Sequence, residues 1–171
     1  NTIASKQAGA SLIVVTGTSK DVKRLAVAKN LGADVVINVE EEDPLEKIME
    51  VTGGEGMDVS LDCTAGAGTI PVLLGIEALK RKGGTLQIQG EDVQDFPNFP
   101  LGKIGNKYIT VKAARGHNYL SCELALKQLN SDRFDIGQIT THKFALKDTH
   151  EAINAVGGSG EVIHVSLMPW A

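Results

Sequence analysis

The sequence is poor in aromatic residues, in cysteine and in basic charge, and each shortage excludes a class of protein. Aromatic residues make up 4% of the 171 residues, which argues against an aromatic-rich β-sandwich. The two cysteines are too few for a disulfide framework, and we expect Cys63 and Cys122 to be buried free thiols. A net charge of −4 gives no basic surface for nucleic acid or anionic membranes, and no apolar run is long enough to cross a bilayer. We therefore expect a soluble, cytoplasmic protein with no nucleic-acid or membrane partner.

Short apolar runs alternate with segments of helical period along the first two thirds of the chain. This alternation is typical of βαβ units and predicts an α/β fold, a Rossmann-like doubly wound parallel sheet. The expected strands lie at 12–16, 35–37, 58–63, 85–89 and 109–114. The expected C-terminal return segment, about 138–171, follows a helix near 121–131 and contains a strand at 138–144, a helix near 147–156 and a strand at 161–167.

Several helix ends can be read from capping residues. Val22, Leu25, Ala28 and Leu31 recur every three residues, and Gly32 follows as a helix stop. The next helix is expected to begin with Asp43 as its N-cap and Pro44 in its first turn. Residues 91–107 contain prolines and glycines and lack a period, so they predict a long surface loop.

The first candidate site lies where the strand at 12–16 ends. In a dinucleotide-binding fold the carboxyl ends of the strands carry the ligand, and an acidic residue at such an end binds the adenosine ribose of NAD. Here the strand end has Gly17 followed by hydroxyls and cations, which favours the 2′-phosphate of NADP. The candidate residues are Gly17, Thr18, Ser19, Lys20 and Arg24. The alternatives are a solvated helix face carrying Lys20, Lys23 and Arg24, or NAD binding through Asp21.

A second glycine-rich stretch, Gly66-Ala67-Gly68, follows the strand at 58–63. It resembles part of a G-x-G-x-x-G dinucleotide fingerprint, but Pro71 stands where the third glycine would be. A plain strand-to-helix turn is the better interpretation. The histidines lie far apart in the sequence, without metal-binding spacing, so we expect no metal site in this chain: His117, His142, His150 and His164.

The order of motifs is similar to one known family. SLIVVTGTSKDVKRLAVAKNLGADVVIN, GGEGMDVSLDCTAG, LKRKGGTLQIQG and ITTHKFALKDTHEAI together resemble the cofactor-binding domain of the zinc-type medium-chain dehydrogenases, the alcohol, sorbitol and threonine dehydrogenases. The resemblance covers essentially the whole chain. It implies that residues 1–171 are a domain fragment, because 2–10 match only the end of the family's first helix. The first strand, its glycine-rich turn and the catalytic zinc domain would then be absent.

The resemblance also implies roles for residues at three later strand ends. They would line the path of the dinucleotide and are Thr64, Ala65, Gly90, Glu91, Ala114 and Arg115. No residue of this chain is expected to be catalytic, and the catalytic zinc would be bound by the parent enzyme outside this chain. Arg115 has an alternative as an ordinary solvated loop residue.

We therefore expect the cofactor-binding portion of an NAD(P)-dependent oxidoreductase that acts on a small polyol or secondary alcohol, with NADP favoured over NAD. The isolated chain is expected to be inactive. The rival hypothesis is a stand-alone nucleotide-binding or scaffold module without redox activity. Without a central strand, the sheet would leave open edges at 12–16 and 58–63. We expect direct pairing of those strands or a strand from a second copy to close the gap, and hence a homo-oligomer.

Overall fold

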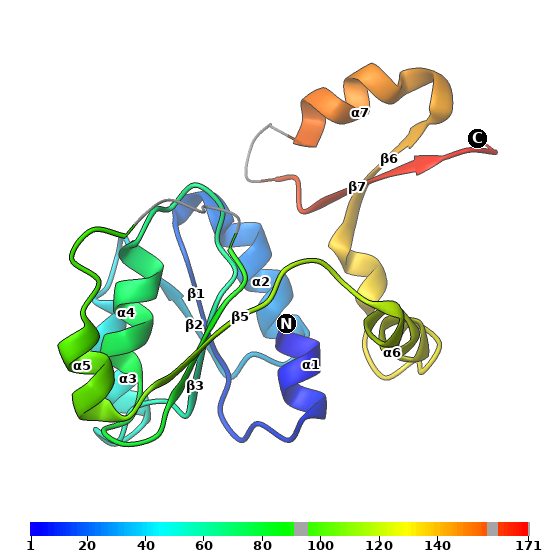
Figure 1. The fold of residues 1–171 in the computed structure, drawn as a ribbon. Helices are drawn as coiled ribbons and strands as arrows, with labels where there is room; N and C mark the ends of the chain where they lie inside the picture. Colours follow the sequence, from blue (N-terminus) through cyan, green and yellow to red (C-terminus); the bar gives the residue numbers. More distant parts are fainter. Residues whose placement is uncertain (91–95, 157–160, 171) are drawn as a thin grey trace. The chain divides into compact units, whose positions relative to one another are not determined.

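The computed structural model describes residues 1–90, 96–156 and 161–170, and its fold is α/β with parallel strands (Figure 1). The chain divides into two compact units. The first unit combines Asn1–Glu42 with Asn118–Ala171, and the second unit is the contiguous stretch Asp43–His117. The α/β class with parallel strands confirms the fold predicted from the sequence.

The second unit is built around a parallel sheet in the order β3-β4-β5. Its elements are α3 Pro44–Val51, β3 Val59–Asp62, α4 Ile70–Ala78, β4 Thr85–Ile88, α5 Leu101–Lys107 and β5 Thr110–Ala113. The last residues of the three strands, Asp62, Ile88 and Ala113, are register partners. The residues that follow each strand therefore start from the same edge of the sheet, which is the edge where ligands of such sheets bind.

Helices α4 and α5 lie on the same side of this sheet (Figure 1). The core between α4 and the sheet contains Val72, Ile76, Leu79, Leu86 and Ile109, all at most 8% exposed. Gly75 faces the sheet within α4. A Cβ added there would lie 2.5 Å from Ser60 Oγ, so the glycine allows the helix to approach the strands closely.

Helix α5 corrects the expectation of a continuous loop over 91–107. The sequence LGKIGNK has two glycines and a poor helix propensity, but Ile104 packs against the core of the second unit. Lys107 donates from Nζ to the carbonyl oxygens of Ile76 (2.8 Å) and Glu77 (2.9 Å) near the end of α4. Tertiary contacts therefore stabilise a helix that its own sequence does not predict. Residues 91–95, which begin the expected loop, lie outside the described residues.

The first unit contains two parallel strand pairs, β1–β2 and β6–β7. Ile37 is fully buried in β2, and α2 packs on this pair through Leu25, which is 8% exposed. Helix α7 packs on the pair β6–β7 (Figure 1). The elements are α1 Thr2–Gln7, β1 Val14–Gly17, η1 Ser19–Asp21, α2 Val22–Asn30, β2 Val35–Asn38, α6 Tyr119–Leu129, η2 Ile136–Ile139, β6 Thr140–Ala145, η3 Leu146–Asp148, α7 Thr149–Val156 and β7 His164–Met168.

The described strands form three separate sheets. Within the units, the strand expected at 12–16 is β1, which pairs with β2, and the strand expected at 58–63 is β3, which pairs with β4. How the remaining edges of β1 and β3 are closed stays a prediction.

The predicted capping residues are confirmed. Asp43 Oδ1 accepts hydrogen bonds from the amides of Leu45 (2.8 Å) and Glu46 (3.0 Å), which satisfies two amide groups in the first turn of α3. Gly32 follows α2 with a φ of +110°, a conformation that favours glycine.

The two cysteines differ from expectation in one respect. Cys63 and Cys122 are free, as predicted, but both are exposed. Cys63 follows β3 at the edge of the sheet and Cys122 lies in α6, a helix without a buried residue. Desolvation nevertheless raises the pKa of the Cys63 thiol, so the thiolate is disfavoured there.

Candidate cofactor site at the strand ends

The end of β1 needs glycine because the chain folds back on itself there. A Cβ added at Gly17 would lie 3.0 Å from the Asp21 Cβ and 3.2 Å from the Leu25 Cδ2. The 3₁₀ turn η1 and the start of α2 therefore pack directly against the strand end. The structure brings the five candidate residues of this strand end, Gly17 to Lys20 and Arg24, into one turn of the chain.

Asp21 is the centre of this turn. Its Oδ2 accepts hydrogen bonds from the Thr18 amide (3.1 Å) and hydroxyl (2.8 Å), and its Oδ1 accepts one from Arg24 Nη1 (2.7 Å). Burial of the Asp21 carboxyl acts to raise its pKa, but these hydrogen bonds and the Arg24 charge outweigh it and lower the pKa of Asp21. Arg24 Nη2 also donates to the Val162 carbonyl oxygen (2.8 Å). Arg24 is thus held in place from two sides.

Asn38, the last residue of β2, and Glu40, just after it, complete this strand end. The Ser19 amide donates to Glu40 Oε2 (2.9 Å), and the Ser19 hydroxyl accepts a hydrogen bond from Asn38 Nδ2 (3.1 Å). The Ser19 hydroxyl and amide hold the pKa of Glu40 below its usual value. Sequence reasoning missed Asn38 and Glu40, although both follow directly from the rule that ligands bind at carboxyl ends of strands.

The cations near β1 differ in their surroundings. Lys23 pairs with Glu161 at 3.1 Å, whereas Lys20 is exposed and has no ion-pair partner among the residues that the structure describes. Lys20 is therefore the cation of this turn that is available to a bound anion, and Arg24 becomes available only by giving up a bond to Asp21 or Val162.

The end of β3 carries a buried carboxylate, Asp62. Asp62 is 8% exposed, and no other charged residue that the structure describes is buried to this extent. Its Oδ1 accepts hydrogen bonds from the Thr64 amide (3.1 Å) and the Thr64 hydroxyl (2.7 Å). The sequence DVSLDCTAG indicated only a strand and a turn, so Asp62 was missed. The signal available was a carboxylate placed in the last position of a strand.

Gly90 lies against this turn from the end of β4. A Cβ added at Gly90 would lie 2.6 Å from the Thr64 carbonyl oxygen and 2.9 Å from Asp62 Oδ2. The structure therefore brings together Thr64 and Gly90, two of the candidate residues, with Asp62 between them. Ala65 follows as an exposed residue, and Glu91 lies outside the described residues.

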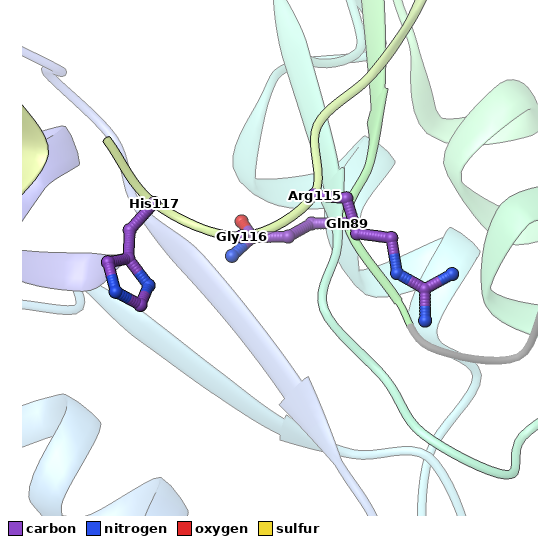
Figure 2. A pocket seen from close by; sticks show the side chains of 4 residues that line it. All are labelled: Gln89, Arg115, Gly116 and His117. Atoms are coloured by element: carbon purple, nitrogen blue, oxygen red, sulfur yellow. The ribbon is translucent and has the colours of Figure 1, made fainter.

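The end of β5 contributes an open depression of about 690 Å³, lined by Gln89, Arg115, Gly116 and His117. The side chains of Arg115 and His117 extend to opposite sides of the Gln89 amide (Figure 2). Ala114 is fixed beside β4, because its amide donates to the Ile88 carbonyl oxygen (3.0 Å). Sequence reasoning named Ala114 and Arg115 as cofactor-binding residues but not His117, which also lines the depression.

The glycines at 66 and 68 lie in the expected turn between β3 and α4. Both have a positive φ, +72° and +62°, and a Cβ at either would meet no atom within 4 Å. Their conformation, and not close contact, accounts for glycine at both positions. Pro71 lies in the first turn of α4, where a missing amide proton costs no helical hydrogen bond.

The residues that the structure describes do not fit a zinc ion. No group of three or more His, Cys, Asp or Glu side chains among them could hold a metal. The Nδ1 atom of His142 lies 3.0 Å from Thr141 Oγ1, and its ring stacks on Phe144, which gives this histidine a structural environment. Within the same ranges, no helix combines the length and hydropathy that a bilayer span requires.

Residues 2–131 match the sequence model of a protein family described as zinc-binding dehydrogenase. Sorbitol dehydrogenase of Halalkalibacterium halodurans is 35% identical over 158 residues, which cover 92% of this chain and 45% of the relative. L-threonine 3-dehydrogenase of Bacillus subtilis is 29% identical, over 96% of this chain and 46% of that protein. The chain therefore spans about half the length of the curated relatives it matches.

The fold has counterparts of known structure. An alcohol dehydrogenase from Thermotoga maritima superposes with a TM-score of 0.84 at 26% identity, covering 97% of this chain and 45% of that one. The alcohol dehydrogenase TADH from Thermus sp. ATN1 superposes with a TM-score of 0.78 at 27% identity. The fold of this chain therefore also occurs in alcohol dehydrogenases of known structure.

Proposed function

The chain belongs to the zinc-binding dehydrogenase family, and from this premise we propose that it forms the cofactor-binding portion of a longer NAD(P)-dependent oxidoreductase. The substrate class is a small polyol or secondary alcohol, in keeping with relatives described as sorbitol dehydrogenase and D-arabitol-phosphate dehydrogenase. Catalytic zinc would come from other parts of the parent enzyme, since the described residues do not fit it. The chain's own residues bind and orient the dinucleotide.

The observation that carries this proposal is the close approach of Gly90 to Thr64 and Asp62 at the shared edge of the β3-β4-β5 sheet. A Cβ at position 90 would lie 2.6 Å from the Thr64 carbonyl oxygen and 2.9 Å from Asp62 Oδ2, so glycine allows the turns after β3 and β4 to pack closely against each other. Beside these packed turns, the open depression at the ends of β4 and β5 offers the polar side chains of Gln89 and Arg115 to a ligand. The arrangement suits a nucleotide that runs across strand ends.

The finer proposal is that the cofactor is NADP. Gly17 leaves the last position of β1 without a carboxylate, and Lys20 and Arg24 supply positive charge in the same turn. Asp21 is engaged by Thr18 and Arg24. Glu40, which holds the Ser19 amide, adds negative charge nearby and favours NAD to the extent that it stays in place. The preference for NADP depends on Lys20 and Arg24 outweighing Glu40.

The remaining proposals concern the complete protein. The residues of this chain proposed to meet the dinucleotide are Gly17, Thr18, Ser19, Lys20, Arg24, Thr64, Ala65, Gly90, Glu91, Ala114 and Arg115. The parent is proposed to be a homo-oligomer, and the isolated chain to lack dehydrogenase activity. Multi-angle light scattering of the full-length protein tests whether it is a homo-oligomer, and a monomer at micromolar concentration contradicts that proposal.

The function is tested with the full-length protein that carries this sequence. Purified protein with zinc is given a panel of polyols and secondary alcohols with NADP or NAD, and formation of the reduced cofactor is followed by its absorbance. Turnover of at least one alcohol is the expected result. Binding of a dinucleotide without turnover of any alcohol supports the rival hypothesis of a nucleotide-binding module, and absence of dinucleotide binding contradicts both.

A further inference from the structure

The guanidinium group of Arg24 joins two segments of the first unit that lie far apart in the sequence. Its Nη1 donates to Asp21 Oδ1 (2.7 Å) in the turn after β1, and its Nη2 donates to the Val162 carbonyl oxygen (2.8 Å), two residues before β7. Asp21 in turn holds the Thr18 amide and hydroxyl through Oδ2. A continuous chain of hydrogen bonds therefore runs from the end of β1 through Arg24 to the segment that leads into β7.

The segment that Arg24 reaches is also tied to β6. Val162 is 9% exposed, and the next amide, that of Ile163, donates to Thr141 Oγ1 (3.0 Å). The Thr141 hydroxyl donates to the carbonyl oxygen of His164 (3.2 Å), the first residue of β7. Residues 162–164 are thus held by Arg24 on one side and by Thr141 on the other.

The two hydrogen bonds of Arg24 differ in strength because their acceptors differ in charge. Asp21 offers a carboxylate, whereas the Val162 carbonyl group is neutral, and opposite charges add Coulomb attraction to a hydrogen bond. A phosphate group bound in the turn after β1 is also an anion, so it competes for Arg24 on better terms than Val162 does. When Arg24 gives up one of its bonds, the bond to Val162 is therefore the one that yields.

We infer that Arg24 couples the turn after β1 to residues 162–164, so that an anionic group bound in the turn draws Arg24 away from Val162 and loosens the segment that leads into β7. The inference rests on the proposed function, because the anionic group is taken to be the 2′-phosphate of NADP. NAD has a neutral hydroxyl at the same position and should leave the Val162 bond in place. Coupling between two sites is reciprocal, so loosening residues 162–164 strengthens the binding of the phosphate.

The first test measures amide hydrogen exchange of the full-length protein by mass spectrometry, without ligand, with saturating NAD and with saturating NADP. We expect NADP to raise exchange in the peptide that contains Ile163 roughly three- to tenfold over NAD, the usual effect of losing one hydrogen bond. Arg24→Lys keeps the positive charge but lacks the fork that reaches both acceptors, so exchange should be high with either dinucleotide. Lys23→Ala is the matched control on the same helix. It removes an exposed ion pair with Glu161, which is a weak contact, and should retain the difference between NADP and NAD.

The second test measures the reciprocal effect by titrating both dinucleotides into Thr141→Val. Valine has the shape of threonine but lacks the hydroxyl that holds Ile163 and His164, and Thr141→Ser keeps that hydroxyl. Thr141→Val should lower the Kd for NADP roughly two- to fivefold and leave the Kd for NAD unchanged, whereas Thr141→Ser should match the wild type. Thermal unfolding checks that all variants fold. A substitution that only damaged the fold would weaken both dinucleotides.

The outcomes separate this inference from the proposed function. Equal exchange at residues 162–164 when NAD and NADP are both bound overturns the inference and leaves the proposed function intact. An affinity of Thr141→Val for NADP that is unchanged or lower overturns the inference as well, and so does a wild-type protein that binds NAD but not NADP. If the wild-type protein binds neither dinucleotide, the proposed function fails and the inference fails with it.

Discussion

The α-carbon of Gly90 lies against the carbonyl oxygen of Thr64, and a Cβ at position 90 would be only 2.6 Å from that oxygen. Backbone of β3 and β4 cannot yield as easily as the end of a side chain. Gly90→Ala is therefore expected to push the two strand ends apart, to cost about 1–3 kcal/mol of stability and to weaken dinucleotide binding. Chemical denaturation and a dinucleotide titration measure the two effects.

Gly102→Ala is the matched control for this change. Gly102 lies in helix α5, and a Cβ there would meet no atom within 4 Å. We expect this variant to keep the cofactor affinity and to gain up to about 1 kcal/mol of stability from the better helix propensity of alanine. Equal losses of dinucleotide affinity in both variants would show that position 90 has no special role.

Lys20→Ala and Arg24→Ala test the choice of cofactor. Each variant removes a cation from the turn after β1 and is expected to lower the ratio of kcat/KM for NADP to kcat/KM for NAD by about tenfold, the effect of losing a charge-assisted hydrogen bond of ~1.5 kcal/mol. Lys23→Ala is the control, because Lys23 pairs with Glu161 in this structure. A ratio that favours NAD and does not respond to either change removes NADP from the proposal.

Gly75→Ala is expected to destabilise the second unit, although alanine is the better helix former. The added Cβ would lie 2.5 Å from Ser60 Oγ and 3.0 Å from Leu86 Cδ1, so α4 would have to move away from the sheet. We expect a loss of about 1–3 kcal/mol in the free energy of unfolding, measured by urea denaturation. The double variant with Ser60→Ala should recover part of that loss. No loss in the single variant would mean that α4 can shift without cost.

Lys107→Met tests what stabilises helix α5 and the end of α4. Two carbonyl oxygens, those of Ile76 and Glu77, would lose their hydrogen-bond donor while the aliphatic stem of the side chain is retained. The expected destabilisation is about 1–3 kcal/mol. Lys82→Met, at an exposed position, should change stability by no more than about 0.5 kcal/mol. Hydrogen exchange at the end of α4 should rise in the first variant only.

The lowered pKa of Asp21 predicts a contribution to stability that depends on pH. A carboxyl group whose native pKa lies below the ordinary value of 3.8 stabilises the fold above that value, and the stabilisation is lost as the pH falls through the native pKa. Asp21→Asn should therefore be less stable than the wild type near neutral pH. The difference should shrink as the pH falls from about 4, where the unfolded carboxyl begins to bind a proton, through the lower native pKa of Asp21. A difference in urea midpoint that is independent of pH would contradict the role of the charged form.

The strands and most helix ends could be predicted because their signals are local. The apolar run at β1, the N-cap Asp43 and the stop at Gly32 each act within a few residues of the element they define. Helix α5 could not be predicted in this way. Its stability comes from Ile104 in the core and Lys107 on the end of α4, and neither contact leaves a pattern in the sequence LGKIGNK.

The strand ends that carry the candidate residues could be predicted, but the contacts between those residues could not. The family resemblance implied roles for Thr64 and Gly90, but only coordinates reveal that Asp62 joins them, since an acidic residue at the end of an apolar run has no distinctive spacing. The prediction that Cys63 and Cys122 are buried was wrong for a related reason. A cysteine's burial depends on what packs over its element, and α6 has no buried residue.

The division into two units sets an order of events during protein synthesis. The second unit, Asp43–His117, is one continuous stretch, whereas the first unit joins Asn1–Glu42 to Asn118–Ala171. The ribosome delivers all of the second unit before the residues that complete the first, so the β3-β4-β5 sheet can fold while β1 and β2 still await their later partners. Residues Asn1–Glu42 therefore wait longer for the rest of their unit than any part of the second unit does.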